Sequence, residues 1–294
     1  MPQTSAPVRD TLQATMPALT PAERLVAALL LKEYPMGGLH SITELAEAAN
    51  VSSPTVVRLA RKLGFEGFTG LQDALRTEIS AQIKRPMSKL DEVSGAAPGH
   101  RLDRMAVAAA ENLHGTLARI DRGDFDAAVA LLADPGRGVF IEGGRLTRSI
   151  ADHLCRHLQI VRPGVRALGG SPGVWPQLLL DIGSTSVLVL FDIRRYESDL
   201  LKLSRLARER GACVVLFTDQ WGSPIAADAD HVFPALVETL SSWDSALAML
   251  LVVEALVAEV QARTGEAARD RIEALEGMFT ATRTFRDFNR SQRD

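Results

Sequence analysis

SITELAEAANVSSPTVVRLARK, residues 41–62, decides the fold of the first part of this chain. Ser41 and Thr43 are both suited to start a helix, and the apolar side chains that follow recur at the spacing of one buried helix face. Pro54 falls where the first turn of a second helix would lie, and a missing amide costs nothing there. The stretch therefore predicts a helix ending near Asn50, a tight turn, and a second helix over residues 54–63.

The second of these helices combines a small polar amino end with a basic flank. In helix-turn-helix proteins the first residues of such a helix reach base edges, while arginines and lysines further along hold phosphates. An ordinary helical hairpin with a solvated basic face has the same pattern, so the spacing alone leaves both interpretations open. The residues predicted to face solvent and to contact DNA are Ser52, Ser53, Thr55, Arg58, Arg61 and Lys62.

The flanking sequence makes the pattern more specific. LTPAERLVAALLL at residues 19–31, ITELAEAANVSSPTVVRLARKLGFEGF at 42–68 and LQDALR at 71–76 together resemble the helix-turn-helix domain of the RpiR/MurR family of bacterial regulators of sugar metabolism. The resemblance covers roughly residues 15–85. It implies that the rest of the chain is a sugar isomerase (SIS) domain that senses a metabolite.

Composition agrees with a folded, two-domain protein. The chain has 294 residues, 46% hydrophobic and 23% charged, which is too long for one ordinary core and too apolar for a disordered chain. The net charge is −3, with a small basic excess confined to the first 90 residues. Neither Cys155 nor Cys213 belongs to a metal-binding spacing, and we find no secretion signal or membrane span. We expect a cytoplasmic protein without a metal or cofactor.

Four segments are predicted: a helix-turn-helix domain at 1–84, a linker at 85–104, a SIS-like effector-sensing and oligomerisation domain at 105–276, and a tail at 277–294. In the third segment short apolar runs alternate with amphipathic ones, as in an α/β doubly wound parallel sheet. The expected strands are 138–142, 165–168, 186–192, 212–218 and 231–233, and a long final helix is expected over 242–264.

Ligands of such sheets bind beyond the carboxyl ends of the strands. SIS domains carry a Ser-x-Ser-Gly-x-Thr loop after the strand that corresponds to 186–191, whereas this chain has DIRRYE at 192–197. The arginines are suited to bind a phosphate or carboxylate. Alternatively, they pair with Asp192 and Glu197, or with another subunit, and fill the pocket that binds the sugar phosphate in typical SIS domains. The predicted effector residues are Gly143, Gly144, Arg145, Thr147, Asp192, Arg194, Arg195, Glu197 and Thr218.

The resemblance predicts a transcriptional regulator that binds double-stranded DNA and a small anionic metabolite, such as a sugar phosphate or a carboxylate. A homodimer or homotetramer would present paired recognition helices to a two-fold or repeated site. The main alternative is a SIS-type sugar-phosphate isomerase, with Glu142, Asp192 or Glu197 as a base. A scaffold protein without an effector is a third possibility.

Overall fold

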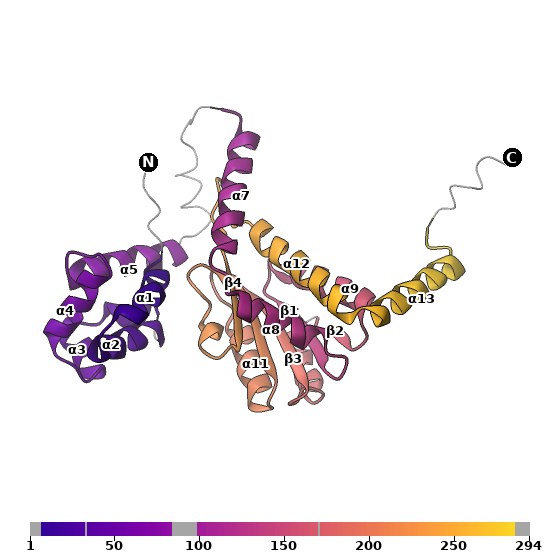
Figure 1. Cartoon of the computed structure of the whole chain (residues 1–294), viewed down its shortest axis with the longest axis horizontal. Coiled ribbons are helices and arrows are strands. Elements are labelled where there is room, and N and C mark those ends of the chain that lie inside the picture. The colour runs from indigo at the N-terminus through magenta and orange to yellow at the C-terminus, as the bar shows by residue number, and fades with distance from the viewer. Residues whose placement is uncertain (1–6, 33, 84–98, 170, 286–294) are drawn as a thin grey trace. The chain divides into compact units, whose positions relative to one another are not determined.

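The computed structural model describes residues 7–32, 34–83, 99–169 and 171–285, which form two compact units (Figure 1). The first unit is formed mainly by residues 7–83, and the second by residues 99–239 and 244–285. Most of the predicted linker, residues 85–98, lies outside the described residues. Among the described residues no helix is both long and apolar enough to cross a membrane.

The first unit is entirely helical. Its helices are α1 (Val8–Thr15), α2 (Pro21–Lys32), α3 (Ile42–Ala48), α4 (Ser53–Lys62) and α5 (Phe68–Ile83). Ser41 caps α3 in a reciprocal box, accepting from the Glu44 backbone while the Glu44 carboxylate accepts from the Ser41 backbone. Leu45, Val56, Leu59 and Leu71 belong to one apolar cluster that all five helices share. The two predicted helices of the turn motif are therefore present, with ends within two residues of expectation.

The second unit is a parallel sheet of five strands in the order β2-β1-β3-β4-β5. The strands are β1 (Gly138–Gly143), β2 (Val165–Ala167), β3 (Ser186–Asp192), β4 (Cys213–Asp219) and β5 (His231–Ala235). Every residue of β3 is buried, as expected for a central strand covered on both faces. The predicted doubly wound fold is confirmed.

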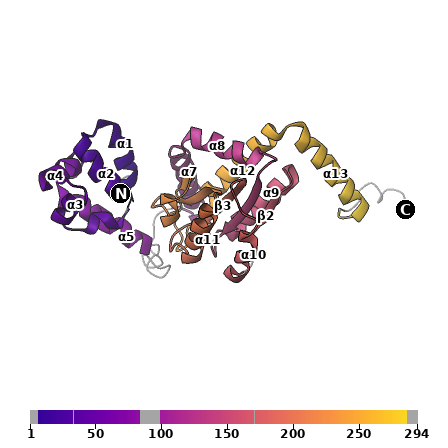
Figure 2. The ribbon, with the colours of Figure 1, turned by 90° about the horizontal axis from the view of Figure 1, so that it is seen from below.

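Helices cover both faces of this sheet (Figure 2). One layer holds α8 (Arg122–Ala133), α9 (Arg148–Val161) and α12 (Leu247–Thr264), which share an apolar cluster with the odd-numbered side chains of β3. The other layer holds α10 (Trp175–Leu179) and α11 (Ser198–Glu209), which pack against the even-numbered ones. The alternation of side chains along β3 thus divides the core into two layers.

Three predicted boundaries are wrong. Helix α7 (Arg101–Leu117) begins inside the predicted linker, and α12 begins at Leu247 instead of residue 242. Ser245, not an earlier serine, accepts the hydrogen bond from the Leu247 backbone. Gly265, with φ of 60°, ends α12 as expected, but α13 (Glu266–Thr282) follows at once and extends into the predicted tail (Figure 1).

Candidate functional site

Helix α4 keeps most of its polar residues on the surface. Arg58, Arg61 and Lys62 are exposed, as is Ser52, while Ser53 is half-buried. The predicted solvent-facing position of Thr55 is wrong, because this residue is only 4% exposed. Its hydroxyl lies 3.0 Å from the hydroxyl of Ser52 and accepts a hydrogen bond from the Arg58 guanidinium. Thr55 therefore organises the start of α4, and the basic side chains form its outer surface.

Lys62 is tied to helix α2. Its amino group lies 2.7 Å from Oε2 of Glu23, which also accepts hydrogen bonds from the backbone and hydroxyl of Thr20. Burial opposes ionisation of Glu23, but these hydrogen bonds and the charge of Lys62 outweigh it and lower the pKa of Glu23 to about 2. The Lys62 side chain remains 41% exposed, so its charge stays available at the end of α4 in a fixed position.

In the second unit, the carboxyl ends of β1, β3 and β4 meet at one edge of the sheet. Asp219, at the end of β4, is fully buried there. Its carboxylate accepts hydrogen bonds from the Arg194 backbone at 2.6 Å, the Tyr196 hydroxyl at 2.8 Å, and the Trp221 and Gly222 backbones at 3.1 Å each. One carboxylate thus ties the loop after β3 to the loop after β4, and this edge is called the crevice below.

Asp192 fixes the same two loops from the end of β3. Its carboxylate accepts hydrogen bonds from the Glu197 backbone at 3.1 Å and from the Ser223 hydroxyl. The predicted effector residues Thr147 and Thr218 are buried, and their hydroxyls donate to the backbone carbonyls of Phe191 at 2.7 Å and Asp192 at 2.8 Å. These two hydroxyls therefore brace strand ends.

Burial raises the pKa of Asp192 from 3.8 to about 6, despite the hydrogen bonds from Ser223 and Glu197. The folded protein then binds this proton more tightly than the unfolded chain. The resulting stability is fully present below about pH 4 and is lost as pH rises through about 6. In Asp192→Asn the group no longer titrates. The unfolding free energy of the variant minus that of the natural protein should therefore increase by about 1–3 kcal/mol between pH 4 and 7.

Urea unfolding at several pH values measures this difference. Asp181→Asn is the matched control, because the Asp181 side chain is 59% exposed. A difference for Asp192→Asn that stays as flat with pH as that of the control would contradict the assignment.

Arg194 is buried, and its partners are not the predicted ones. Its guanidinium lies 2.9 Å from Asp244 and 3.3 Å from Glu238, and it stacks 4.1 Å from the centre of the Trp221 ring. The side chain is only 5% exposed. The salt-bridge interpretation named Asp192 and Glu197 as the partners, and both were wrong, since the acidic partners come from the segment between β5 and α12.

Arg195 differs from Arg194 in its exposure, its backbone conformation and its contacts. It is exposed, has a left-handed φ of 64°, and forms no ion pair or hydrogen bond with the described residues. The loop therefore buries one arginine and offers the other to solvent.

Two glycines of the loop after β1 lie in close contact with neighbouring atoms. A Cβ on Gly143 would lie 2.8 Å from backbone atoms of Thr147 and Arg148, and one on Gly144 would lie 2.8 Å from Oε1 of Glu197. The same Glu197 oxygen accepts a hydrogen bond from the Arg145 backbone at 2.5 Å. Gly143 is therefore required by its backbone contacts, whereas a side chain at position 144 would displace the end of Glu197. The Arg145 side chain is exposed.

Glu142, a candidate base, is engaged with a residue that the sequence analysis missed. Its Oε1 lies 2.9 Å from the Arg148 guanidinium and accepts from the Gly143 backbone at 2.9 Å. Burial raises the pKa of Glu142 in spite of both contacts. No sequence signal singled out Arg148, because its role depends on the turn that brings the start of α9 back over β1.

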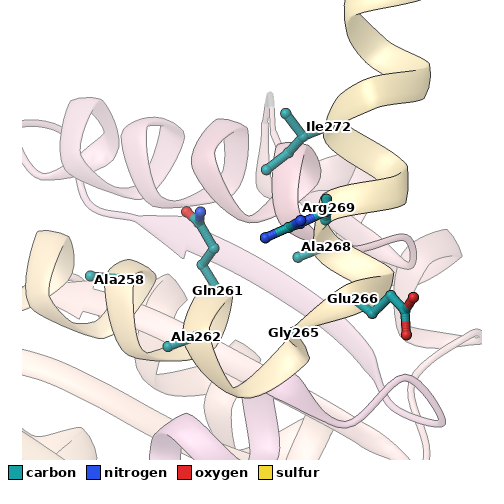
Figure 3. A pocket seen from close by; sticks show the side chains of 8 residues that line it. All are labelled: Ala258, Gln261, Ala262, Gly265, Glu266, Ala268, Arg269 and Ile272. Carbon is teal, nitrogen blue, oxygen red and sulfur yellow. The ribbon is translucent and has the colours of Figure 1, made fainter.

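Two open grooves lie elsewhere in the second unit. One, of about 750 Å³, fills the angle between α12 and α13 and is lined by Gln261, Glu266 and Arg269 among others (Figure 3). Another, of about 500 Å³, lies beside α9 and α13. None of the predicted effector residues lines either groove.

Comparison with known proteins gives a counterpart for each unit. A model of the rpiR-family helix-turn-helix domain matches residues 8–82, and a SIS domain model matches residues 131–259. Over 262 residues the chain is 26% identical to the HTH-type transcriptional regulator HexR of Pseudomonas aeruginosa. The aligned region covers 87% of this chain and 90% of that protein. The two domains therefore occur in the order of the two structural units.

Two solved structures resemble this chain in fold. The sugar isomerase domain of an RpiR transcription factor from Sphaerobacter thermophilus has a TM-score of 0.55 at 25% identity, covering 60% of this chain and 99% of that one. The Vibrio vulnificus NanR protein, solved in complex with ManNAc-6P, has a TM-score of 0.53 at 19% identity, covering 94% of this chain and 98% of that one. The NanR likeness establishes a shared fold.

Proposed function

This chain belongs to the rpiR family of helix-turn-helix transcriptional regulators that carry a SIS domain, and on that premise we propose that it binds an operator as a homo-oligomer under the control of a small anionic metabolite. The proposal places the protein in the cytoplasm, with α4 in the major groove and the effector at the crevice. It leaves open whether binding represses or activates transcription.

The observation that carries the DNA-binding part is the outer surface of α4. Arg58, Arg61 and Lys62 are exposed on one short helix, whose Val56 and Leu59 side chains are fully buried. Guanidinium and ammonium groups on such a helix neutralise phosphates and set its register in the groove. The salt bridge from Glu23 holds one of these cations in place before DNA arrives.

The effector part is supported by the chemistry of the crevice. Arg145 and Arg195 are exposed there, and the loop after β1 already directs a backbone amide at a carboxylate oxygen. Guanidinium groups and backbone amides both donate hydrogen bonds to oxyanions. NanR, which has the same fold, was solved with a sugar phosphate, and a sugar phosphate is the ligand class we propose first for this chain.

We place regulation ahead of catalysis. A base that moves a proton between sugar carbons must face the substrate, whereas Glu142 and Asp192 are buried and engaged by Arg148 and Ser223. Glu197 is engaged by the Arg145 amide. Turnover of common sugar phosphates without any DNA binding would reverse this order.

Coupling between the crevice and α4 requires only a modest difference in effector affinity between two arrangements of the paired recognition helices, typically about 1–3 kcal/mol. The test is fluorescence anisotropy of the full chain with duplexes that tile the DNA beside its own gene, repeated with metabolites that raise its melting temperature. Sequence-specific binding that one metabolite changes supports the proposal. Absence of binding to every tile, for a folded chain, overturns it.

The two neighbouring arginines should separate stability from effector response. Arg194→Ala removes the partner of Asp244, whose side chain is 11% exposed, and is expected to lower the unfolding free energy by about 2–4 kcal/mol. Arg195→Ala should change stability by less than about 0.5 kcal/mol and weaken the response to the effector. Urea unfolding and effector-dependent anisotropy measure the two effects. Equal stability loss in both variants would contradict the distinction.

A further inference from the structure

The Glu197 side chain links the loop after β3, to which it belongs, with the loop after β1. Glu197 is the residue before α11, where a short polar side chain ordinarily caps the helix, yet its side chain makes no such cap. Its carboxylate instead crosses to the loop after β1 and accepts the Arg145 N–H at 2.5 Å. The backbone N–H of Glu197 is held by Asp192, so the direction of this reach is fixed.

The position that receives the carboxylate has the features of an oxyanion site. Gly144 lets the oxygen approach so closely that a Cβ there would lie 2.8 Å from it, and the Arg145 amide supplies a donor. The nearest fixed cation of this loop, Arg148, is already paired with Glu142. The exposed side chains of Arg145 and Arg195 pair with none of the described residues, including Glu197. A bound oxyanion would therefore find the Arg145 amide as a donor, on loops that also carry the exposed Arg145 and Arg195 side chains.

We propose that the Gly144–Arg145 loop is an oxyanion site occupied by the chain's own Glu197 carboxylate, and that a phosphate group of the effector binds there by displacing Glu197. This deepens the proposed function and rests on it, because it assigns the effector's anionic group to one place in the crevice. Two negative oxygens cannot share one amide, so ligand and Glu197 compete. Glu197 thereby sets the affinity threshold at which the regulator responds.

The proposed oxyanion site restricts the shape of its occupant as well as its charge. A Cβ at position 144 would lie 2.8 Å from Oε1 of Glu197, so a side chain there would push the end of Glu197 out of this position. Glu197 itself is an exposed residue, so its side chain has solvent to enter when it is displaced. The buried carboxylates of Asp192 and Asp219 stay in place during this exchange, because their hydrogen bonds hold the loops and do not involve the Glu197 side chain.

The experiment titrates inorganic phosphate into the full-length chain by calorimetry in a phosphate-free buffer. Three proteins are compared: the natural chain, Glu197→Ala and Asp199→Ala. Asp199 is the matched control, because it is a half-exposed carboxylate two residues further on whose recorded partner is Lys202, and its loss changes the net charge equally. We expect Glu197→Ala to bind phosphate at least tenfold more tightly than both other proteins. The Arg145 amide resonance should shift with phosphate in that variant.

Equal phosphate affinity in all three proteins, or an equal gain in Asp199→Ala, overturns the proposal. If Glu197→Ala does not fold, Glu197→Gln takes its place, since it keeps the acceptor for the Arg145 amide and loses only the charge. A folded Gln variant without a gain of about threefold or more is equally contrary. Failure of the wider function is distinguishable, because that would appear as loss of operator binding by the natural chain whatever its affinity for phosphate.

Discussion

Replacing both Arg58 and Arg61 with Ala is expected to weaken operator binding by roughly 100-fold at physiological salt, with no loss of folding. Both side chains are exposed on α4, and Arg58 is steadied by the Thr55 hydroxyl at 3.0 Å. If each guanidinium neutralises one phosphate, the slope of log K against log salt should become less steep by about 0.9 per lost contact, or about 2 for each bound chain. Anisotropy titrations at four or more salt concentrations measure both quantities.

Arg76→Ala provides the matched control for this experiment. Arg76 is also an exposed arginine of the helical unit, at 59% exposure, but it lies on α5 and pairs with Asp73. It should leave both the affinity and the salt slope nearly unchanged. Identical losses in the Arg76 variant and in the α4 variant would show that the effect is one of overall charge, and α4 would lose its assignment as the recognition helix.

The sequence predicted those parts of the molecule that depend on neighbours along the chain. Strand β3 was predicted with its observed limits, residues 186–192, because an apolar run bounded by polar residues is the pattern of a strand buried on both faces. The start of α3 followed from Ser41, since a capping box is complete within four residues. The crevice edge followed from the rule that ligands of doubly wound sheets bind beyond the carboxyl ends of the strands, and β1, β3 and β4 end there.

The rest depended on partners far away in sequence. Lys62 was predicted to be exposed, but its salt bridge reaches back 39 residues to Glu23. The late start of α12 was also missed, and Asp244, which precedes this helix, pairs with the distant Arg194. The assignment of Glu197 to the Arg145 amide spans 52 residues and has no local pattern at all. The contacts of Asp244 and Glu197 depend on loops that the sheet brings together, and that of Lys62 depends on the packing of α2 and α4 in one apolar cluster.

Arg162 is the clearest example, and its replacement by Met is expected to cost about 2–4 kcal/mol of unfolding free energy. The residue is 2% exposed, at the end of α9, without a carboxylate within ion-pair distance among the described residues. Its guanidinium donates to the backbone carbonyls of Leu132, Asp134, Arg137 and Pro163, and so satisfies the open carbonyls at the end of α8. Met fills similar space but leaves the buried Leu132 carbonyl without this donor, at a cost of about 1 kcal/mol or more, and removes a donor from the more accessible carbonyls of Asp134 and Arg137.

Arg166→Met is the control, because that side chain is 61% exposed and its ion pair with Asp181 is solvated. It should shift the urea midpoint hardly at all, since exposed pairs contribute about 0–1 kcal/mol. The direction of the Arg162 result is not obvious in advance, because burying a charge is itself expensive and an apolar replacement sometimes stabilises. Here the acceptors belong to the backbone and remain after the substitution, so the cost of a missing donor falls mainly on the buried Leu132 carbonyl. A stabilised Arg162→Met protein would mean that water reaches the end of α8 and that the guanidinium is not its cap.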